Sequence, residues 1–333
     1  MKKRLTKLLL LAVMLVVGIS AMAQKDVTAQ YITNATLSSL DGWTNQNFNT
    51  PQKGNNTTGY AVECWAGNPL AKTGYSLTQT ITLPKGHYTL VSYSFYRQSW
   101  GAADNPTKSL AYLKAGDNQV PIKTLGSITA AGYANSQAEG ANTFDSKMYR
   151  NTIDFTIDSD NTAIEIGITG THDATASWCI VGQFELIDKD QTATLDSPFD
   201  VTGYMVNPGF EYRDMSGWTM SPASSFGTQG NEQTFKTGGF YAEKWQSSSA
   251  GALSERSFSQ TVTGMPAGLY KLVANVGGNG TYIKLNDKTV NGSAETADIE
   301  AYSVIEAGQN LVITAGKTAA GSANWIHFDN FRL

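Results

Sequence analysis

The chain has 333 residues, of which 16% are charged and 41% hydrophobic, and its formal net charge is −4. This length is enough for about two domains at ~100 to 200 residues each. The acidic balance and the lack of a Lys/Arg stripe exclude nucleic acid and anionic membrane surfaces as partners, because both require clustered positive charge.

The first residues have the three parts of a secretory signal peptide. A basic cluster within residues 2–7 precedes an apolar stretch over residues 8–17 and the small-residue run that ends at Ala21-Met22-Ala23. The apolar stretch is shorter than the ~20 residues that a membrane-spanning helix needs. We therefore expect residues 1–23 to be cleaved, with export to the periplasm, cell surface or extracellular space and without membrane insertion. Cleavage removes four of the 24 Lys and Arg, so 20 remain against 28 Asp and Glu and the net charge becomes −8.

The remaining chain contains two copies of one series of sequence blocks. Asp26-Val27-Thr28 recurs as Asp200-Val201-Thr202, Gly42-Trp43-Thr44 as Gly217-Trp218-Thr219, and Ser76-Leu77-Thr78-Gln79-Thr80 as Ser257-Phe258-Ser259-Gln260-Thr261. A Pro-x-Gly-x-Tyr turn follows in both copies, at Pro84 and at Pro266. Blocks that recur in one order indicate a tandem repeat. We predict domain 1 over residues 24–190, a linker over 191–199 and domain 2 over 200–333.

Short runs of β-branched and aromatic residues with period-2 patterning alternate with Gly, Asn, Asp and Pro turns through both halves. Examples are the runs 80–82, 88–91, 153–157 and 164–168. This pattern predicts strands almost throughout. The fold class is therefore all-β, with two tandem antiparallel β-sandwich (jelly-roll) domains. An extra stretch between Gln98 and Met148, which contains Trp100, is expected to be a long inserted loop region in domain 1.

The only two cysteines are Cys64 and Cys179, both in the first half. In an exported chain they either form one disulfide or are small buried apolar residues. The sequence leaves both alternatives open, because it does not show whether the two strands are neighbours.

Each repeat opens and closes in a characteristic way. The opening Asn207-Pro208-Gly209-Phe210-Glu211 and the closing segment from Trp325 to Leu333 frame the second copy. This outline resembles the galactose-binding-domain-like β-sandwich, used by many carbohydrate-binding modules and by surface proteins of gut Bacteroidetes. The resemblance covers nearly all of both halves. It implies a β-sandwich fold and a glycan ligand.

The resemblance also implies a structural Ca²⁺ in domain 2, because such modules often hold the ion between the opening acid and the closing Asp. Domain 2 has both, as Glu211 and Asp329, and hard oxygen ligands suit Ca²⁺. Domain 1 departs from the pattern, since Gly182 stands at the position of Asp329 and its opening segment has no matching Glu. The alternative is an exposed Glu and a turn-capping Asp that never meet.

Sugar recognition needs aromatic faces and a few fixed polar groups. Glu63 and Trp65, like Glu243 and Trp245, are two apart on an expected strand, so each pair projects from one face of its sheet. The candidate ligand-binding residues are Glu63, Trp65, Tyr96, Arg97 and Trp100 in domain 1, and Glu243 and Trp245 in domain 2. Structural pairing of each Glu with an Arg or Tyr is the alternative; Arg97 is the expected partner in domain 1. Trp178 and Trp325 are expected to be core or rim residues.

The sequence contains no pattern of residues typical of an enzyme. Glycosidases need paired carboxylates at a cleft, and each repeat supplies one. His87, His172 and His327 lack metal-ligand spacing. We therefore expect a non-enzymatic protein that binds a polysaccharide or glycoconjugate glycan. The alternative is an adhesion or structural protein in which tandem sandwiches contact other surface proteins.

Overall fold

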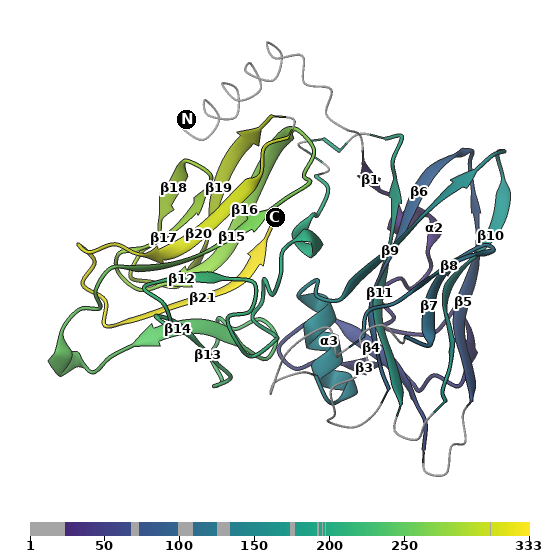
Figure 1. Cartoon of the computed structure of the whole chain (residues 1–333), viewed down its shortest axis with the longest axis horizontal. Helices are drawn as coiled ribbons and strands as arrows, with labels where there is room; N and C mark the ends of the chain where they lie inside the picture. Colours follow the sequence, from purple (N-terminus) through teal and green to yellow (C-terminus); the bar gives the residue numbers. More distant parts are fainter. Residues whose placement is uncertain are drawn as a thin grey trace.

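The computed structural model describes residues 24–67, 73–98, 109–124, 134–173, 177–191, 193, 194, 196, 198–306 and 308–333. It forms two tandem antiparallel β-sandwiches that lie side by side (Figure 1). The all-β fold class predicted from the sequence is confirmed. The expected signal peptide and Trp100 lie outside the described residues. Within the described part of the chain, no helix is long and apolar enough to cross a membrane.

The N-terminal sandwich consists of two sheets. One has the order β3 (Gln52–Lys53), β4 (Tyr60–Trp65), β11 (Trp178–Asp188), β6 (Gly86–Arg97) and β9 (Arg150–Ile157), with β1 (Lys25–Asp26) paired to β11. The other has the order β2 (Thr44–Gln46), β5 (Gly74–Leu83), β10 (Thr162–Thr171), β7 (Ala111–Ala115) and β8 (Asn118–Pro121). Its helices are α2 (Thr28–Tyr31) and α3 (Gln137–Asp145).

The C-terminal sandwich repeats this plan. One sheet has the order β13 (Gly227–Gln229), β14 (Tyr241–Trp245), β21 (Trp325–Arg332), β16 (Gly268–Gly277) and β19 (Ala297–Ile305). The other has the order β12 (Thr219–Ser221), β15 (Arg256–Val262), β20 (Leu311–Lys317), β17 (Thr281–Leu285) and β18 (Lys288–Asn291). Two 3₁₀ turns, η2 (Thr202–Tyr204) and η3 (Ser248–Ala250), lie outside the sheets.

Alternating side chains place one face of each strand in a core. In β9, for example, Ile153, Phe155 and Ile157 are buried while the residues between them are exposed, the pattern of a half-buried antiparallel strand. Trp43 and Trp218, the repeated Gly-Trp-Thr tryptophans, are both buried in the cores of their sandwiches. Those two tryptophans therefore pack the interior.

The stretch between Gln98 and Met148 holds more structure than the expected loop. Its described residues form β7, β8 and α3. Ser136 caps α3 by accepting a hydrogen bond from the Glu139 N–H, and the Glu139 carboxylate accepts one from the Asn135 N–H at 2.7 Å. The arrangement resembles a capping box, except that Glu139 accepts from the residue before the N-cap and not from the N-cap Ser136 itself.

Helix α3 covers the outer face of the β4–β11–β6 sheet and adds a second hydrophobic cluster there. Close packing depends on glycine. A Cβ at Gly140 would lie 2.3 Å from Ile180 Cδ1, and one at Gly182 would lie 2.5 Å from Phe144. The helix region therefore leaves Trp178 only 3% exposed, whereas its counterpart Trp325 in the other sandwich is 36% exposed.

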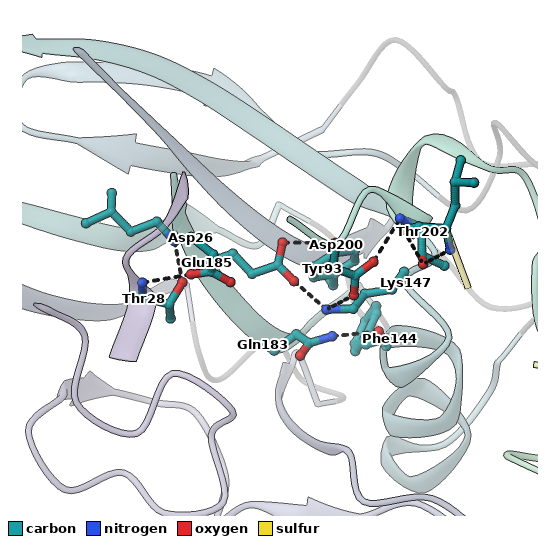
Figure 2. A network of polar contacts seen from close by, with 11 residues as sticks. Asp26, Thr28, Tyr93, Phe144, Lys147, Gln183, Glu185, Asp200 and Thr202 are labelled. Carbon is teal, nitrogen blue, oxygen red and sulfur yellow. Dashed lines mark hydrogen bonds and ion pairs between the residues drawn. The ribbon is translucent and has the colours of Figure 1, made fainter. Parts of the chain in front are cut away.

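The two sandwiches are joined by polar and aromatic contacts, many of them on or beside α3, which lies between them in Figure 1. The Lys147 ammonium forms ion pairs with Glu185 of the first sandwich and, at 3.7 Å, with Asp200 of the second (Figure 2). Glu139 pairs with Arg213, and the rings of Tyr149 and Tyr212 meet edge to face at 5.7 Å. Phe199 packs against clusters of both sandwiches. The contacts fix one sandwich against the other.

Candidate functional site

Two exposed tryptophans lie directly opposite each other on neighbouring strands of the C-terminal sandwich. Trp245 of β14 pairs with Trp325 of β21, and their side chains are 61% and 36% exposed. Directly opposed side chains point to the same face of a sheet. The adjacent residues Ile326 and Phe328 point the other way, into the core. The outer face of this sheet therefore presents a pair of indole rings, which we call the tryptophan platform (Trp245 and Trp325).

A carboxylate fixes one of these rings. Glu243 lies two residues before Trp245 on the same face, and its Oε2 accepts a hydrogen bond of 2.7 Å from Trp325 Nε1. The N-terminal sandwich has the same arrangement, since Glu63 Oε2 accepts a hydrogen bond of 2.8 Å from Trp178 Nε1. In both sandwiches the repeated Glu thus accepts a hydrogen bond from an indole N–H of the closing strand and not from the expected Arg or Tyr. Glu63 also accepts one of 3.4 Å from Asn49 Nδ2.

A stack of rings extends the platform along β21. The imidazole of His327 lies parallel to Phe235 with 3.8 Å between ring centroids, and its other neighbour is Trp325 at 4.7 Å. The Nε2 atom of His327 is 3.0 Å from Thr296 Oγ1, whereas its buried Nδ1 has no hydrogen-bond partner among the described residues. Burial lowers the pKa of His327 to about 4. The ring is therefore neutral near pH 7 and acts as a flat packing surface beneath the platform.

In the N-terminal sandwich the corresponding face is closed. Trp178 is only 3% exposed, and the Arg97 guanidinium lies over its ring at 4.5 Å. Arg97 is itself buried and donates to Asn135, which precedes α3. Trp65 remains 49% exposed at the edge of this face. Glu63, Trp65 and Arg97 are thus on one face as the sequence predicted, but α3 and the residues before it cover most of that face.

Tyr96 is not part of this face. Its side chain is fully buried in the core of the N-terminal sandwich. The reason is the period of two along β6: Phe95 and Arg97 point outward, so Tyr96 between them points inward. The prediction that Tyr96 contacts a ligand is therefore wrong. Trp100, proposed for the same cluster, lies outside the described residues.

The two acids proposed as metal ligands converge on one loop. Glu211 Oε1 accepts hydrogen bonds from the N–H groups of Gly239 and Phe240, and Asp329 Oδ2 accepts one from Thr237 N–H. Both carboxyls are buried. Burial raises the pKa of Glu211 to about 8, and burial together with the charge of Glu211 raises the pKa of Asp329 well above its usual range. A cation between them would favour the charged forms that burial disfavours.

Two carboxylates are fewer than the six to eight oxygens that Ca²⁺ takes. The described residues contain no group of three or more His, Cys, Asp or Glu placed to hold a metal ion. Backbone carbonyls or waters would complete the shell. In the N-terminal sandwich, Phe144 of α3 occupies the space that a side chain at Gly182, the position matching Asp329, would need.

Cys64 and Cys179 are direct partners on the neighbouring strands β4 and β11, and both are buried. Opposed residues of an antiparallel pair have Cα atoms ~4.5 to 5.5 Å apart, within the span of a disulfide. No disulfide joins these two residues in the structure. The disulfide, one of the two alternatives that the sequence leaves open, stays a prediction.

Sequence reasoning missed three contributors to the candidate site: Trp325, Phe235 and His327. Trp325, like Trp178, is expected from the sequence to be a core or rim residue just before its closing strand. Period-2 alternation along Trp325-Ile326-His327-Phe328 would have placed Trp325 and His327 on one face. Phe235 stands in a loop, where periodicity gives no signal.

The chain was compared with known proteins. No protein-family model matches it, and no curated protein does. The solved structures that resemble it include TmCBM61 in complex with β-1,4-galactotriose, with 24% sequence identity over 38% of this chain and 94% of that chain and a TM-score of 0.31. A tandem CBM22-1–CBM22-2 domain from Paenibacillus barcinonensis covers 94% of this chain and 98% of its own, at 9% identity and a TM-score of 0.28. A cyclase from Fischerella sp. TAU matches 38% of this chain and 93% of its own, with 16% identity and a TM-score of 0.31.

Proposed function

We propose that this protein is a non-catalytic glycan-binding protein and that the tryptophan platform of the C-terminal sandwich is its binding face. The observation that carries the proposal is the pair of opposed, exposed indole rings of Trp245 and Trp325. Aromatic rings with solvent-facing surfaces and nearby polar groups suit the mixed apolar and hydroxyl surface of a pyranose. The ligand would be a polysaccharide or a glycoconjugate glycan.

The polar surroundings favour a sugar over a purely apolar partner. Glu243 holds the Trp325 ring through its Nε1, so the ring has a set orientation before a ligand arrives. The second carboxylate oxygen of Glu243 is available to accept a hydroxyl hydrogen bond. Preorganised groups reduce the entropy lost on binding.

Export is part of this proposal. The signal-peptide pattern of residues 1–23 would deliver the protein to the periplasm, the cell surface or the extracellular space, where polysaccharides are available. A bacterium of the Bacteroidetes type is the proposed source.

The test is a glycan array and calorimetric titration on the mature protein, with Trp245→Ala and Trp325→Ala as site variants. Each should weaken binding by roughly tenfold or more, equal to ~1.4 kcal/mol, while retaining its melting temperature. Trp65→Ala is the matched control, because Trp65 is also an exposed tryptophan at the end of the equivalent strand. It should bind as the unchanged protein does.

Two results would contradict the proposal. If no glycan of a broad panel gives measurable binding, the proposal is refuted. That result would favour the adhesion alternative, in which the exposed tryptophans contact another surface protein. Equal loss of binding in all three tryptophan variants would remove the platform as the specific site.

A structural Ca²⁺ between Glu211 and Asp329 belongs to the same proposal. Two buried carboxylates that accept hydrogen bonds from the same loop support it. Thermal unfolding of the full chain in Ca²⁺ and in EDTA tests it. We expect Ca²⁺ to raise the melting temperature of the unchanged protein, because a ligand that binds only the folded state stabilises it. Glu211→Gln should lose that increase; an equal increase in the variant would assign the effect to another site.

A further inference from the structure

A cavity of about 260 Å³ lies between the two sandwiches, away from the tryptophan platform. The N-terminal sandwich contributes Asn56 from the β3–β4 turn and Glu139 and Asn142 from α3. The C-terminal sandwich contributes Glu211, Arg213 and Lys236. The loop over residues 236–240 leads from this cavity into β14, whose far end carries Trp245. Five residues of extended strand separate the two places by roughly 17 Å.

The amide of Asn142 is the strongest sign of a ligand. The residue is 3% exposed, and its Oδ1 has no hydrogen-bond partner among the described residues. This oxygen lies against Gly54 of the β3–β4 turn, which is not part of the cavity lining. The other side of the amide, Nδ2, faces Gly239, which lines the cavity. A ligand hydroxyl oxygen there would accept a hydrogen bond from Nδ2.

A second polar side chain reaches the same place from the other sandwich. A methyl group at Gly239 would lie 3.1 Å from Glu211 Oε2 and 3.4 Å from Asn142 Nδ2. Glu211 Oε1 is already occupied by two backbone N–H groups. The Asn142 amide and the Oε2 side of Glu211 thus border one small volume, and neither sandwich alone would enclose it.

The charges around the cavity indicate what kind of ligand fits. Arg213 is paired with Glu139, and Lys236 with Glu232 at 3.3 Å. Acidic groups outnumber basic ones, so an anionic ligand would find no unpaired cation among the lining residues described. Most of the lining is polar, which disfavours an apolar ligand. An uncharged molecule with several hydroxyl groups matches this set of donors and acceptors.

We propose that this interdomain cavity is a second binding site and that it holds one uncharged sugar residue. The residue is either a free monosaccharide or the terminal unit of a glycan; both present the same ring hydroxyls. This site goes beyond the platform function and does not depend on it, because it uses none of the platform residues and requires both sandwiches; it shares only Glu211 with the proposed Ca²⁺ site.

The test uses the full mature chain with Trp245→Ala and Trp325→Ala combined, so that the platform does not contribute. Ligand-observed NMR is run with free galactose, glucose, mannose and N-acetylglucosamine, and separately with oligosaccharides that end in each of them. Into this background we introduce Asn142→Leu, which removes the amide and with it the Nδ2 donor at the cavity, or Gly239→Ala, which adds a methyl group to the cavity and keeps every polar group.

Gly227→Ala is the matched control, since Gly227 lies in the same sandwich with open space where the methyl group would go. At least one sugar should bind the background protein. Asn142→Leu and Gly239→Ala should each weaken that binding at least tenfold, and Gly227→Ala should leave it unchanged. Where Asn142→Leu fails to fold, Gly239→Ala decides alone. Stronger binding of oligosaccharides assigns the site to glycan ends, and equal binding of monosaccharides assigns it to free sugar.

The proposal is overturned if neither the monosaccharides nor the oligosaccharides bind the background protein. It is equally overturned if both cavity variants bind the sugar with the same affinity as the background protein. It is also overturned if only Ca²⁺ binds and the cavity variants alter that binding alone. A negative result for the platform proposal is distinguishable from a negative result here, because glycan binding by the platform is measured with Trp245→Ala and Trp325→Ala in the otherwise unchanged chain.

Discussion

The hydrogen bond from Trp325 Nε1 to the Glu243 carboxylate orients one of the two indole rings of the proposed binding face. Glu243→Ala removes it and frees the indole to rotate, so we expect glycan affinity to fall by about 1 to 2 kcal/mol. Glu243→Gln keeps an acceptor oxygen and should lose less. Calorimetric titration with the best glycan from the array measures both.

Glu63 offers the matched control for that prediction, because it holds Trp178 in the same way. Its indole is buried beneath Arg97 and the α3 region. Glu63→Ala should therefore lower the stability of the N-terminal sandwich and leave glycan affinity unchanged. Equal losses of affinity in the two alanine variants would contradict the assignment of binding to the C-terminal sandwich.

His327 predicts how the C-terminal sandwich responds to acid. Burial lowers its pKa to about 4 in the folded state, whereas an unfolded chain has a histidine pKa of ~6.5. The folded state therefore binds the proton less tightly. The contribution of the neutral ring to stability is complete above pH ~6.5 and is lost as the pH falls toward 4.

Chemical denaturation at a series of pH values between 4 and 7 tests this. His327 should lower the free energy of unfolding across that window by up to about 3 kcal/mol. Glu211, whose pKa burial raises to about 8, acts in the opposite direction over the same range. The prediction therefore concerns the difference between the two proteins: the unchanged protein should lose more stability, or gain less, than His327→Gln as the pH falls from 7 to 4. A variant with the same slope as the unchanged protein would assign the acid sensitivity to other groups.

At the scale of elements, helix α3 is what distinguishes the two sandwiches. It packs against β11 only because Gly140 has no side chain to meet Ile180. Gly140→Val should overpack this contact and destabilise the N-terminal sandwich by about 1 to 3 kcal/mol. Gly227→Val, at a glycine with open space around it, is the control, and urea denaturation is the measurement. Equal stability of the two variants would mean that α3 is not closely packed in solution.

Much of the element pattern could be predicted from the sequence, because strands and turns are set by local alternation. The runs at 153–157 and 164–168 are strands β9 and β10. Helix α3 was missed because a nine-residue helix with buried residues on more than one side has no clear 3.6-residue stripe. The segment Ser136-Gln137-Ala138-Glu139 has the Ser-x-x-Glu signature of a helix N-terminus, and this was the usable signal.

At the scale of the molecule, the contacts of Lys147, Arg213 and Tyr149 predict that the two sandwiches unfold together. Burial alone would lower the pKa of Lys147, but Glu185 and Asp200 raise it above its usual value, so the ion pairs keep it charged. Differential scanning calorimetry should show one transition. Lys147→Met leaves Glu185 buried without its ion-pair partner and should split the transition in two, at a cost of about 3 to 5 kcal/mol.

Lys288→Met is the control, because Lys288 forms only an exposed pair with its neighbour Asp287, and it should keep one transition. Two transitions in the unchanged protein would contradict the coupling. The sequence predicted two sandwiches but not their mutual arrangement. Contacts such as Glu139 with Arg213 join residues far apart in the chain, and no local pattern encodes which surface meets which.

The two rings of the platform differ from the buried Trp43, Trp178 and Trp218 in their contact with solvent. Water around an excited indole shifts its emission to longer wavelength, so Trp245 and Trp325, together with the exposed Trp65, should contribute to the red side of the protein's fluorescence. A sugar ring laid across Trp245 and Trp325 would displace water from these two rings and move their emission to the blue. The protein thus carries its own optical reporter of occupancy, and Trp245→Ala and Trp325→Ala should each remove part of the signal.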